Sequence, residues 1–418
     1  MTTPQTPRRV IITFLGNRGI STTYRHQEKN YEGSVFAEAL RRFTTYDLML
    51  VCVTEDAEKN TWPILEVLND PRIEKVPIPT GRTTEEMWKT FTCITDRVQK
   101  GDIVTFDITH GLRSLPFLVF LFAAYLKAAK EVQIEAVYYG ALELGSGGPR
   151  PAPTAPPEQK TASAPSTPAP VINLSEFVSM IDWIMATIQF TKRGDGQDLA
   201  DLIKDEPDLS NAIRDTSLAL ALSRPLSTMA SAVQLKAALD QPASGSAGKN
   251  KPFDVLRDQV RDAYAGFALA NPREASQLQL NLRNQSNMTR WYLDRLLYVQ
   301  AVTLARELLI TTVGFLLNVK VKDLFDEHCR RCLIEAAIKQ YNAEREGCTF
   351  KGHPSPRYGD FMELQQARAI ADLYAKLGKI RNDLAHTEMR KKPTPAAEII
   401  EKASELCDQV CALADSVV

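Results

Sequence analysis

The chain has 418 residues, of which 44% are hydrophobic and 24% are charged. This length allows two or three soluble domains with substantial cores and excludes a mini-protein. The 50 Lys and Arg residues are balanced by 51 Asp and Glu residues, so the formal net charge is -1. A polyanionic ligand must therefore meet a local basic patch, because the surface as a whole is not basic.

The first apolar run ends before Gly16. At about six residues it is too short for the hydrophobic core of a signal peptide. No later stretch reaches the roughly 18 apolar residues that a membrane-spanning helix needs. Seven cysteines are an odd number for a disulfide framework, and most lie in apolar or helical patterns. We expect reduced thiols, a cytoplasmic protein and no membrane partner.

Short apolar runs alternate with helical patterns over residues 1–144. The apolar runs predict strands at 9–16, 47–54, 73–79, 102–109 and 134–143. The patterns between them predict helices at 33–43, 60–69, 84–99 and 115–130. Strands and helices that alternate at this spacing form right-handed βαβ units. We therefore expect an α/β domain whose parallel sheet is covered by helices on both faces.

Pro, Ala, Gly, Ser and Thr dominate residues 145–170. Such a segment cannot bury enough apolar surface to fold, so it predicts a flexible linker. Beyond it the pattern is helical almost throughout, which predicts an all-α second half. A helical connecting region is expected at 171–275, with a mobile loop near 240–252, and a second helical domain at 276–418.

The stretch DITHGLRSLP, residues 107–116, follows a predicted strand and opens a predicted helix. Ligands of open parallel sheets bind at such turns, outside the carboxyl ends of the strands. Gly111 allows a tight turn, Ser114 can cap the helix, and Arg113 with free backbone N–H groups can face a phosphate. The alternative is that Thr109, His110 and Ser114 merely cap a helix.

Two further turns are expected at the same edge of the sheet. The turn at 15–21 carries Gly16, Asn17, Arg18 and Gly19, and the turn at 53–62 carries Thr54 and Glu55. The Gly-x-x-Gly of the first turn lacks the third glycine of the dinucleotide fingerprint. These residues are candidates for binding a phosphate-bearing ligand.

Five motifs of this half, FLGNRG, VTEDA, IPTGRTTEEMW, DITHGLRSLP and YYGALE, lie between about residues 8 and 144. Together they resemble the CARF sensor domains of the CRISPR-associated CARF-HEPN ribonucleases of type III systems. LSEFVSMIDWI, just after the linker, also fits that family. The resemblance implies a Rossmann-like domain that dimerises and binds one cyclic oligoadenylate across the two-fold axis, with the tetra-adenylate favoured and the hexa-adenylate second.

The resemblance also implies a HEPN nuclease motif near the C-terminus, and GKIRNDLAHTEMRKK supplies Arg381, Asn382 and His386. RNA carries its own nucleophile, the 2′-hydroxyl, so an imidazole and a permanent cation suffice in principle for cleavage without a metal. Five residues on an ideal helix turn through about 500°, which leaves Arg381 and His386 roughly 140° apart. Two copies across a dimer axis could face both groups the same way, and Asn382 shares a face with His386.

Six basic residues and two acidic ones lie between Lys376 and Lys392. This local surplus suits contact with phosphates. The alternative is an ordinary solvated helix end, where Lys and Arg are favoured.

A competing pattern consists of Cys329, Cys332, Cys348 and His353, whose spacing is that of zinc ligands. The first two cysteines, however, continue a helical apolar pattern, and free cysteine is a common small buried residue. We expect no metal site here.

The sequence thus predicts a homodimeric, metal-independent ribonuclease that cyclic oligoadenylate activates and that cuts single-stranded RNA. Two alternatives remain open. One is a non-catalytic nucleotide sensor that acts through a partner. The other is a sensor that hydrolyses its own cyclic activator, with Thr109 and His110 as participants.

Overall fold

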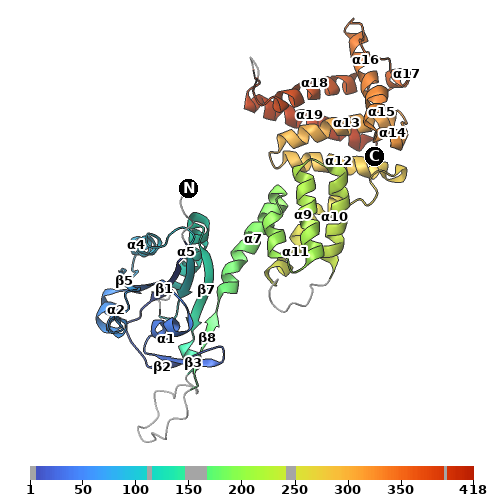
Figure 1. Cartoon of the computed structure of the whole chain (residues 1–418). Helices are drawn as coiled ribbons and strands as arrows, with labels where there is room; N and C mark the ends of the chain where they lie inside the picture. Colours follow the sequence, from blue (N-terminus) through green and yellow to red (C-terminus); the bar gives the residue numbers. More distant parts are fainter. Residues whose placement is uncertain (1–5, 111–114, 146–166, 242–250, 390–392) are drawn as a thin grey trace, which may run out of the picture. The chain divides into compact units, whose positions relative to one another are not determined.

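The computed structural model of the chain describes residues 6–110, 115–145, 167–241, 251–389 and 393–418 (Figure 1). The chain divides into two compact units, Met1–Asp182 and Trp183–Val418. The first unit holds a sheet with flanking helices, and the second is helical, as the two halves of the sequence predict.

The boundary between the units differs from the predicted one. Helix α6 (Leu142–Gly145) and strand β8 (Ala169–Asn173) belong to the first unit, so both ends of the predicted linker at 145–170 are parts of the fold. A Cβ on Gly145 would lie 2.8 Å from the backbone of Ala169. The small residues Gly145 and Ala169, which suggested a linker, here allow α6 and β8 to pack closely. Residues 146–166, and residues 242–250 of the predicted loop, lie outside the described residues.

The sheet has eight strands in the order β3-β2-β8-β7-β6-β1-β4-β5. The five strands β7, β6, β1, β4 and β5 are parallel to one another, as predicted. The sheet as a whole is mixed, because β8 is antiparallel to β7 and because β2 and β3 form an antiparallel hairpin. The remaining strands are β1 (Arg9–Phe14), β2 (Thr22–His26), β3 (Lys29–Gly33), β4 (Leu48–Val53), β5 (Ile73–Pro77), β6 (Ile103–Asp107) and β7 (Gln133–Gly140).

Sequence reasoning misses the β2–β3 hairpin because its strands bury few side chains. Tyr24 is buried in β2, and its neighbours along the strand are polar or partly exposed. The turn between His26 and Lys29 needs a left-handed residue, Gln27 with φ 55°, and no glycine marks it. The strands therefore lack an apolar pattern, and the turn between them lacks a Gly or Asn signal.

Helices cover both faces of the sheet, as predicted. Alternate residues of β1 point to opposite faces. Val10 and Ile12 pack in a core that includes residues of α4 and α5, while Ile11 packs in a second core with residues of α1 and α3. The helices of this unit are α1 (Phe36–Phe43), α2 (Glu55–Asn60), α3 (Trp62–Glu66), α4 (Thr84–Thr95) and α5 (Leu115–Lys130).

Helix α7 (Ser175–Arg193) begins in the first unit and ends in the second. The second unit has one large apolar core, to which α13 (Tyr298–Leu316) contributes most of its length. Its other α-helices are α8 (Gln197–Leu202), α9 (Pro207–Ala221), α10 (Pro225–Asp240), α11 (Lys251–Tyr264), α12 (Leu278–Leu293), α14 (Val321–Leu324), α15 (Glu327–Cys329), α16 (Ala336–Arg345), α17 (Tyr358–Met362), α18 (Ala367–Ala385) and α19 (Ala396–Ser416). Short 3₁₀ turns lie at Ala265–Phe267 and Ala275–Gln277, and Arg330–Glu335 forms a π-helical segment.

Helix α13 is long and apolar enough to cross a membrane, by length and composition alone. This differs from the expectation that no stretch of the sequence is long and apolar enough. It packs against α12, α18 and α19, and Leu308, Leu309 and Val313 are fully buried. Its apolar surface is therefore covered by other helices of the same unit, as in the core helix of a helical domain.

Gly314 is a place where α13 approaches its neighbours closely. A Cβ there would lie 2.2 Å from Leu324 Cδ2 and 2.7 Å from Ile334 Cδ1. We predict that Gly314→Ala lowers the free energy of unfolding by about 1 to 3 kcal/mol, because overpacking outweighs the better helix propensity of alanine. Urea unfolding measures this change.

Gly378 in α18 is the matched control, because a Cβ there meets nothing within 4 Å. Gly378→Ala should leave stability unchanged or raise it by up to about 1 kcal/mol. Equal effects of the two substitutions would contradict the close approach at Gly314.

Candidate functional site

The carboxyl ends of β1 and β6 lie side by side in the sheet. From β1 the strand order runs to β4 and β5 on one side and to β6 and β7 on the other, so the order reverses between β1 and β6. Ligands of open α/β sheets bind in the crevice at such a reversal. A Cβ on Gly16 would lie 3.4 Å from the carbonyl oxygen of His110, so the turns after the two strands are in contact there.

Asp107, the last residue of β6, is fully buried between these two strands. Its Oδ2 accepts a hydrogen bond from Thr13 Oγ1 of β1 at 2.5 Å, and its Oδ1 accepts one from the backbone N–H of Thr109 at 2.8 Å. Burial raises the pKa of Asp107, and the two hydrogen bonds partly offset the cost of burying the carboxyl group. The carboxyl group joins β6, β1 and the following turn.

His110 caps the N-terminus of α1. Its Nε2 accepts a hydrogen bond from the backbone N–H of Phe36 at 3.1 Å. An accepting Nε2 means a neutral ring with its proton on Nδ1, and burial lowers the pKa of His110 in agreement with that form. Val35, the N-cap residue of α1, has no side chain that could accept this bond. The capping alternative therefore holds for His110, but the helix is α1 and not the one that follows the turn.

Thr109 links the same turn to β7. Its Oγ1 accepts a hydrogen bond from the backbone N–H of Gly140 at 2.8 Å. The two candidates for hydrolysis of a cyclic activator, Thr109 and His110, thus both bond to backbone groups of the fold.

The other predicted residues of this edge have different surroundings. The carbonyl oxygen of Gly16 accepts a hydrogen bond from Thr61 Oγ1 at 2.7 Å, while Asn17, Arg18 and Gly19 are exposed. Thr54 caps α2, and Glu55 forms an exposed ion pair with Lys59. Asn17 and Arg18 are thus the polar side chains of the β1 turn that remain open to a ligand. Gly111, Arg113 and Ser114 lie outside the described residues.

A cavity of about 600 Å³ begins where the β1 turn ends, at Ile20 and Ser21. Its wall carries two acidic residues, Glu32 and Glu143, and no Lys or Arg among its described residues. Carboxylates repel a phosphate, so the charge of this cavity does not suit the expected ligand.

The second candidate site is the last part of α18. Asn382 and His386 are exposed there and Arg381 is half-buried, while Leu377 and Ile380 face the core. His386 is the C-cap residue, and its backbone N–H bonds to the carbonyl oxygen of Asn382 at 3.1 Å. The helix thus presents Asn382 and His386 to solvent and is anchored by apolar residues just before the motif.

Asp383, inside the motif, has a different role from its neighbours. It is buried, and its Oδ2 accepts a hydrogen bond from the backbone N–H of Thr394 at 3.3 Å. After His386 the chain reverses through Thr387 and Glu388, which have φ values of 45° and 65°. Left-handed conformations are costly for such residues, so the position of His386 is held by a defined turn.

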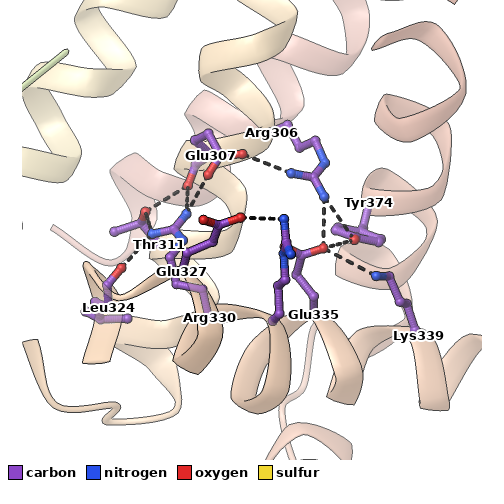
Figure 2. A network of polar contacts seen from close by, with 10 residues as sticks. Arg306, Glu307, Thr311, Leu324, Glu327, Arg330, Glu335, Lys339 and Tyr374 are labelled. Atoms are coloured by element: carbon purple, nitrogen blue, oxygen red, sulfur yellow. Dashed lines mark hydrogen bonds and ion pairs between the residues drawn. The ribbon is translucent and has the colours of Figure 1, made fainter. Parts of the chain in front are cut away.

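A buried polar network holds α18 to its neighbours (Figure 2). Arg306 of α13 bonds to Glu335 Oε2 at 2.9 Å and to Tyr374 Oη at 3.2 Å, and Tyr374 donates to the same carboxylate. Tyr374 lies on α18 about two turns before Arg381. Burial raises the pKa of Tyr374, which keeps its hydroxyl protonated as a donor.

Sequence reasoning misses this network, although one signal was present. Arg306 and Glu307 are adjacent charges within the apolar pattern of α13. Charged residues in a buried helix need partners, so they predict an internal ion pair.

The competing zinc pattern is not assembled. Among the described residues, which include Cys329, Cys332, Cys348 and His353, no group of three or more His, Cys, Asp or Glu side chains could hold a metal ion. Cys332 Sγ lies 3.7 Å from His328 Nε2, a residue outside the pattern.

The cap formed by His110 predicts a pH dependence of stability. The unfolded chain protonates His110 near pH 6.5, but the folded protein does so only at lower pH because its pKa is lowered. The unfolded state therefore binds more protons, and stability falls as pH falls from 7 to 5.5. Urea unfolding at several pH values should show a shallower dependence for His110→Gln.

His26 serves as the reference, because burial lowers its pKa as well. His26→Gln and the double variant should flatten the profile further. The His110 ring lowers the pKa of the buried Asp107, so His110→Gln removes that influence as well. A His110→Gln profile identical to that of the wild type would contradict the neutral cap.

Two comparisons with known proteins give matches. The family model described as CRISPR-associated protein MJ1674, second domain, matches residues 179–266, which run from α7 to the 3₁₀ turn after α11. The CRISPR-associated protein MJ1674 of Methanocaldococcus jannaschii is 26% identical over 133 residues. This match covers 30% of the chain and 18% of the relative's length. The two matches support a CRISPR-associated family for this chain.

Proposed function

We propose that the chain is a homodimeric endoribonuclease of type III CRISPR defence, in which a CARF domain binds cyclic oligoadenylate and a HEPN domain then cuts single-stranded RNA. The observation that carries this proposal is the helical placement of the Arg381 to His386 motif, in which Asn382 and His386 reach solvent while α18 is anchored in the core. The CRISPR-associated matches and the strand reversal between β1 and β6 support it.

The proposed chemistry uses the nucleophile of the RNA itself. The 2′-oxygen attacks the adjacent phosphorus and loses its proton, the bond from phosphorus to the 5′-oxygen breaks, and the leaving oxygen gains a proton. The products are a 2′,3′-cyclic phosphate and a 5′-hydroxyl. His386 serves these proton transfers, and Arg381 stabilises the charge that builds up on the phosphorane. Asn382, four residues before His386, orients the imidazole or the strand.

On an ideal helix, one copy of the motif does not face both groups the same way. Arg381 and His386 diverge by roughly 140° around α18. A second α18, related by a two-fold axis, brings a matching pair to the same phosphate. Lys376 and Lys379 are exposed on the same helix and add positive charge for the RNA backbone.

The first unit has a surface suited to a dimer. Phe117, Leu121 and Tyr125 of α5 lie four residues apart on one helix face and are 69%, 47% and 49% exposed. Tyr125 contacts Phe91 of α4 with ring centroids 4.9 Å apart, and Phe91 contacts the exposed Trp88. A contiguous apolar patch of this kind is typical of an interaction surface, and a second copy of the chain carries the same patch.

The proposed ligand binds at the edge where β1 and β6 end. Asn17 and Arg18 are exposed there, and Arg113, which lies outside the described residues, is a further candidate from the sequence. Guanidinium groups and backbone N–H groups suit the phosphates of a cyclic tetra-adenylate or, second, a cyclic hexa-adenylate.

His386→Ala should abolish RNA cleavage in the presence of cyclic oligoadenylate, because the residue is assigned to proton transfer. Arg381→Ala should lower the rate about 100-fold or more, as expected for loss of a group that stabilises the transition state. Cleavage of a labelled single-stranded RNA, with and without EDTA, measures both, and EDTA should not inhibit the wild type.

Arg368→Ala is the matched control, since Arg368 is exposed on the same helix outside the motif. It should retain the wild-type rate. Cleavage by His386→Ala at the wild-type rate would exclude the nuclease assignment. If the wild type binds the activator but cuts no RNA, a sensor that acts through a partner is the better interpretation.

Arg113→Ala should weaken binding of cyclic tetra-adenylate about 10- to 150-fold, the loss expected for one charge-assisted hydrogen bond. Isothermal titration with the full chain measures the affinity. Arg42→Ala is the control, because Arg42 lies in the last turn of α1, at the opposite end from the His110 cap. Equal affinities of both variants would show that Arg113 does not contact the ligand. Chromatography of the recovered ligand separates binding from hydrolysis.

A further inference from the structure

A cavity of about 270 Å³ lies in the second unit, away from the motif on α18. Its lining comes from the start of α10 and the turn before it, from the segment between the two 3₁₀ turns, from α12 and α13, and from the region around α14 and the π-helical segment. The residues are Ser223, Arg224, Pro225, Leu226, Ser227, Arg273, Gln285, Glu307, Thr311, Phe325 and Arg330. Three arginines and one glutamate give this wall a positive balance.

The glutamate is already neutralised by other residues. Glu307 accepts hydrogen bonds from Arg306 Nη1 and from Arg330 Nη2, both at 2.9 Å (Figure 2). Arg330 also bonds to Thr311 Oγ1 at 3.1 Å and to the carbonyl oxygen of Leu324 at 2.8 Å. These contacts hold the inner wall of the cavity rigid and leave no negative charge there to repel an anion.

The other two arginines have free charge. Arg224 and Arg273 are exposed, and neither forms an ion pair within the part of the chain that the structure describes. The guanidinium of Arg273 lies 5.7 Å from the ring centroid of Phe325, which limits its orientations at the cavity wall. Two unpaired guanidinium groups beside one small cavity are a suitable site for a phosphate.

The backbone of α10 provides further hydrogen-bond donors beside the two guanidinium groups. Arg224 is the N-cap residue of this 16-residue helix, and no side chain caps it. Pro225 has no N–H, so Leu226 and Ser227, which line the cavity, carry the uncapped N–H groups of the first turn. These N–H groups are donors that suit an anion, as the guanidinium groups of Arg224 and Arg273 are.

We propose that this cavity binds a phosphate group through Arg224 and Arg273. Its volume lies below the roughly 300 to 1,000 Å³ of pockets that enclose drug-sized ligands, so it suits a phosphate or pyrophosphate group and not a whole nucleotide. The group belongs either to a free phosphate compound or to an RNA strand. The proposal does not depend on the nuclease assignment, because it uses none of the residues of the α18 motif.

The test is isothermal titration of the full chain at constant ionic strength with two probes, sodium pyrophosphate and a single-stranded RNA of about ten nucleotides. The RNA is titrated into proteins that also carry His386→Ala, so that it is not cut. The test variant is Arg224→Gln with Arg273→Gln. The control is Arg283→Gln with Arg368→Gln, which removes the same charge from two exposed arginines of the same unit.

We expect the test variant to lose about tenfold in affinity per arginine and the control to bind like the wild type. Loss of pyrophosphate binding alone identifies a free phosphate compound, and loss of RNA binding identifies a strand phosphate. Saturable binding of neither probe, or equal losses in both variants, overturns the proposal. If the double glutamine variant does not fold, the single variants Arg224→Gln and Arg273→Gln replace it, and unchanged affinity for both probes in both single variants overturns the proposal.

Discussion

The buried carboxyl group of Asp107 is the interaction on which the ligand edge depends. A carboxyl group removed from water needs hydrogen bonds, and Thr13 of β1 and the N–H of Thr109 supply two of them. These bonds fix the ends of β1 and β6 relative to each other and set the direction of the turn. His110 then reaches the first N–H of α1. Polar residues that resemble a binding motif thus first serve to build the edge, and the side chains left for a ligand are those further along the turns.

The second unit solves a similar problem within a helical core. Arg306 in the apolar helix α13 must be paired, and it is paired with Glu335 and Tyr374 from two other helical segments. Breaking a buried pair of this kind typically costs about 3 to 5 kcal/mol, because one charge is left without a partner. Since Tyr374 belongs to α18, the same pairing sets where that helix lies along α13 and therefore where Arg381 and His386 emerge.

Both candidate sites therefore consist of a rigid buried support and exposed polar residues. At the sheet edge the support is Asp107 with Thr13, and at α18 it is the network with Glu335 together with Asp383, which bonds to the N–H of Thr394. Such an arrangement preorganises a site, because the exposed side chains are carried by backbone that has few alternatives. The arginine-lined cavity has the same construction, with Arg330 held by Glu307 and with Arg224 and Arg273 forming no ion pair among the described residues.

The sequence by itself determined the two structural halves, the five parallel strands and most helices, because apolar periodicity reports directly on which residues are buried. It also determined the residue types of both candidate sites, including the spacing from Arg381 to His386. It did not determine the β2–β3 hairpin, the incorporation of β8 into the sheet or the cap from His110 to α1. The first buries little apolar surface, and the others join residues far apart in the chain, such as His110 and Phe36. Only the tertiary structure decides these contacts, because hydrogen bonds between distant segments leave no periodic pattern in the sequence.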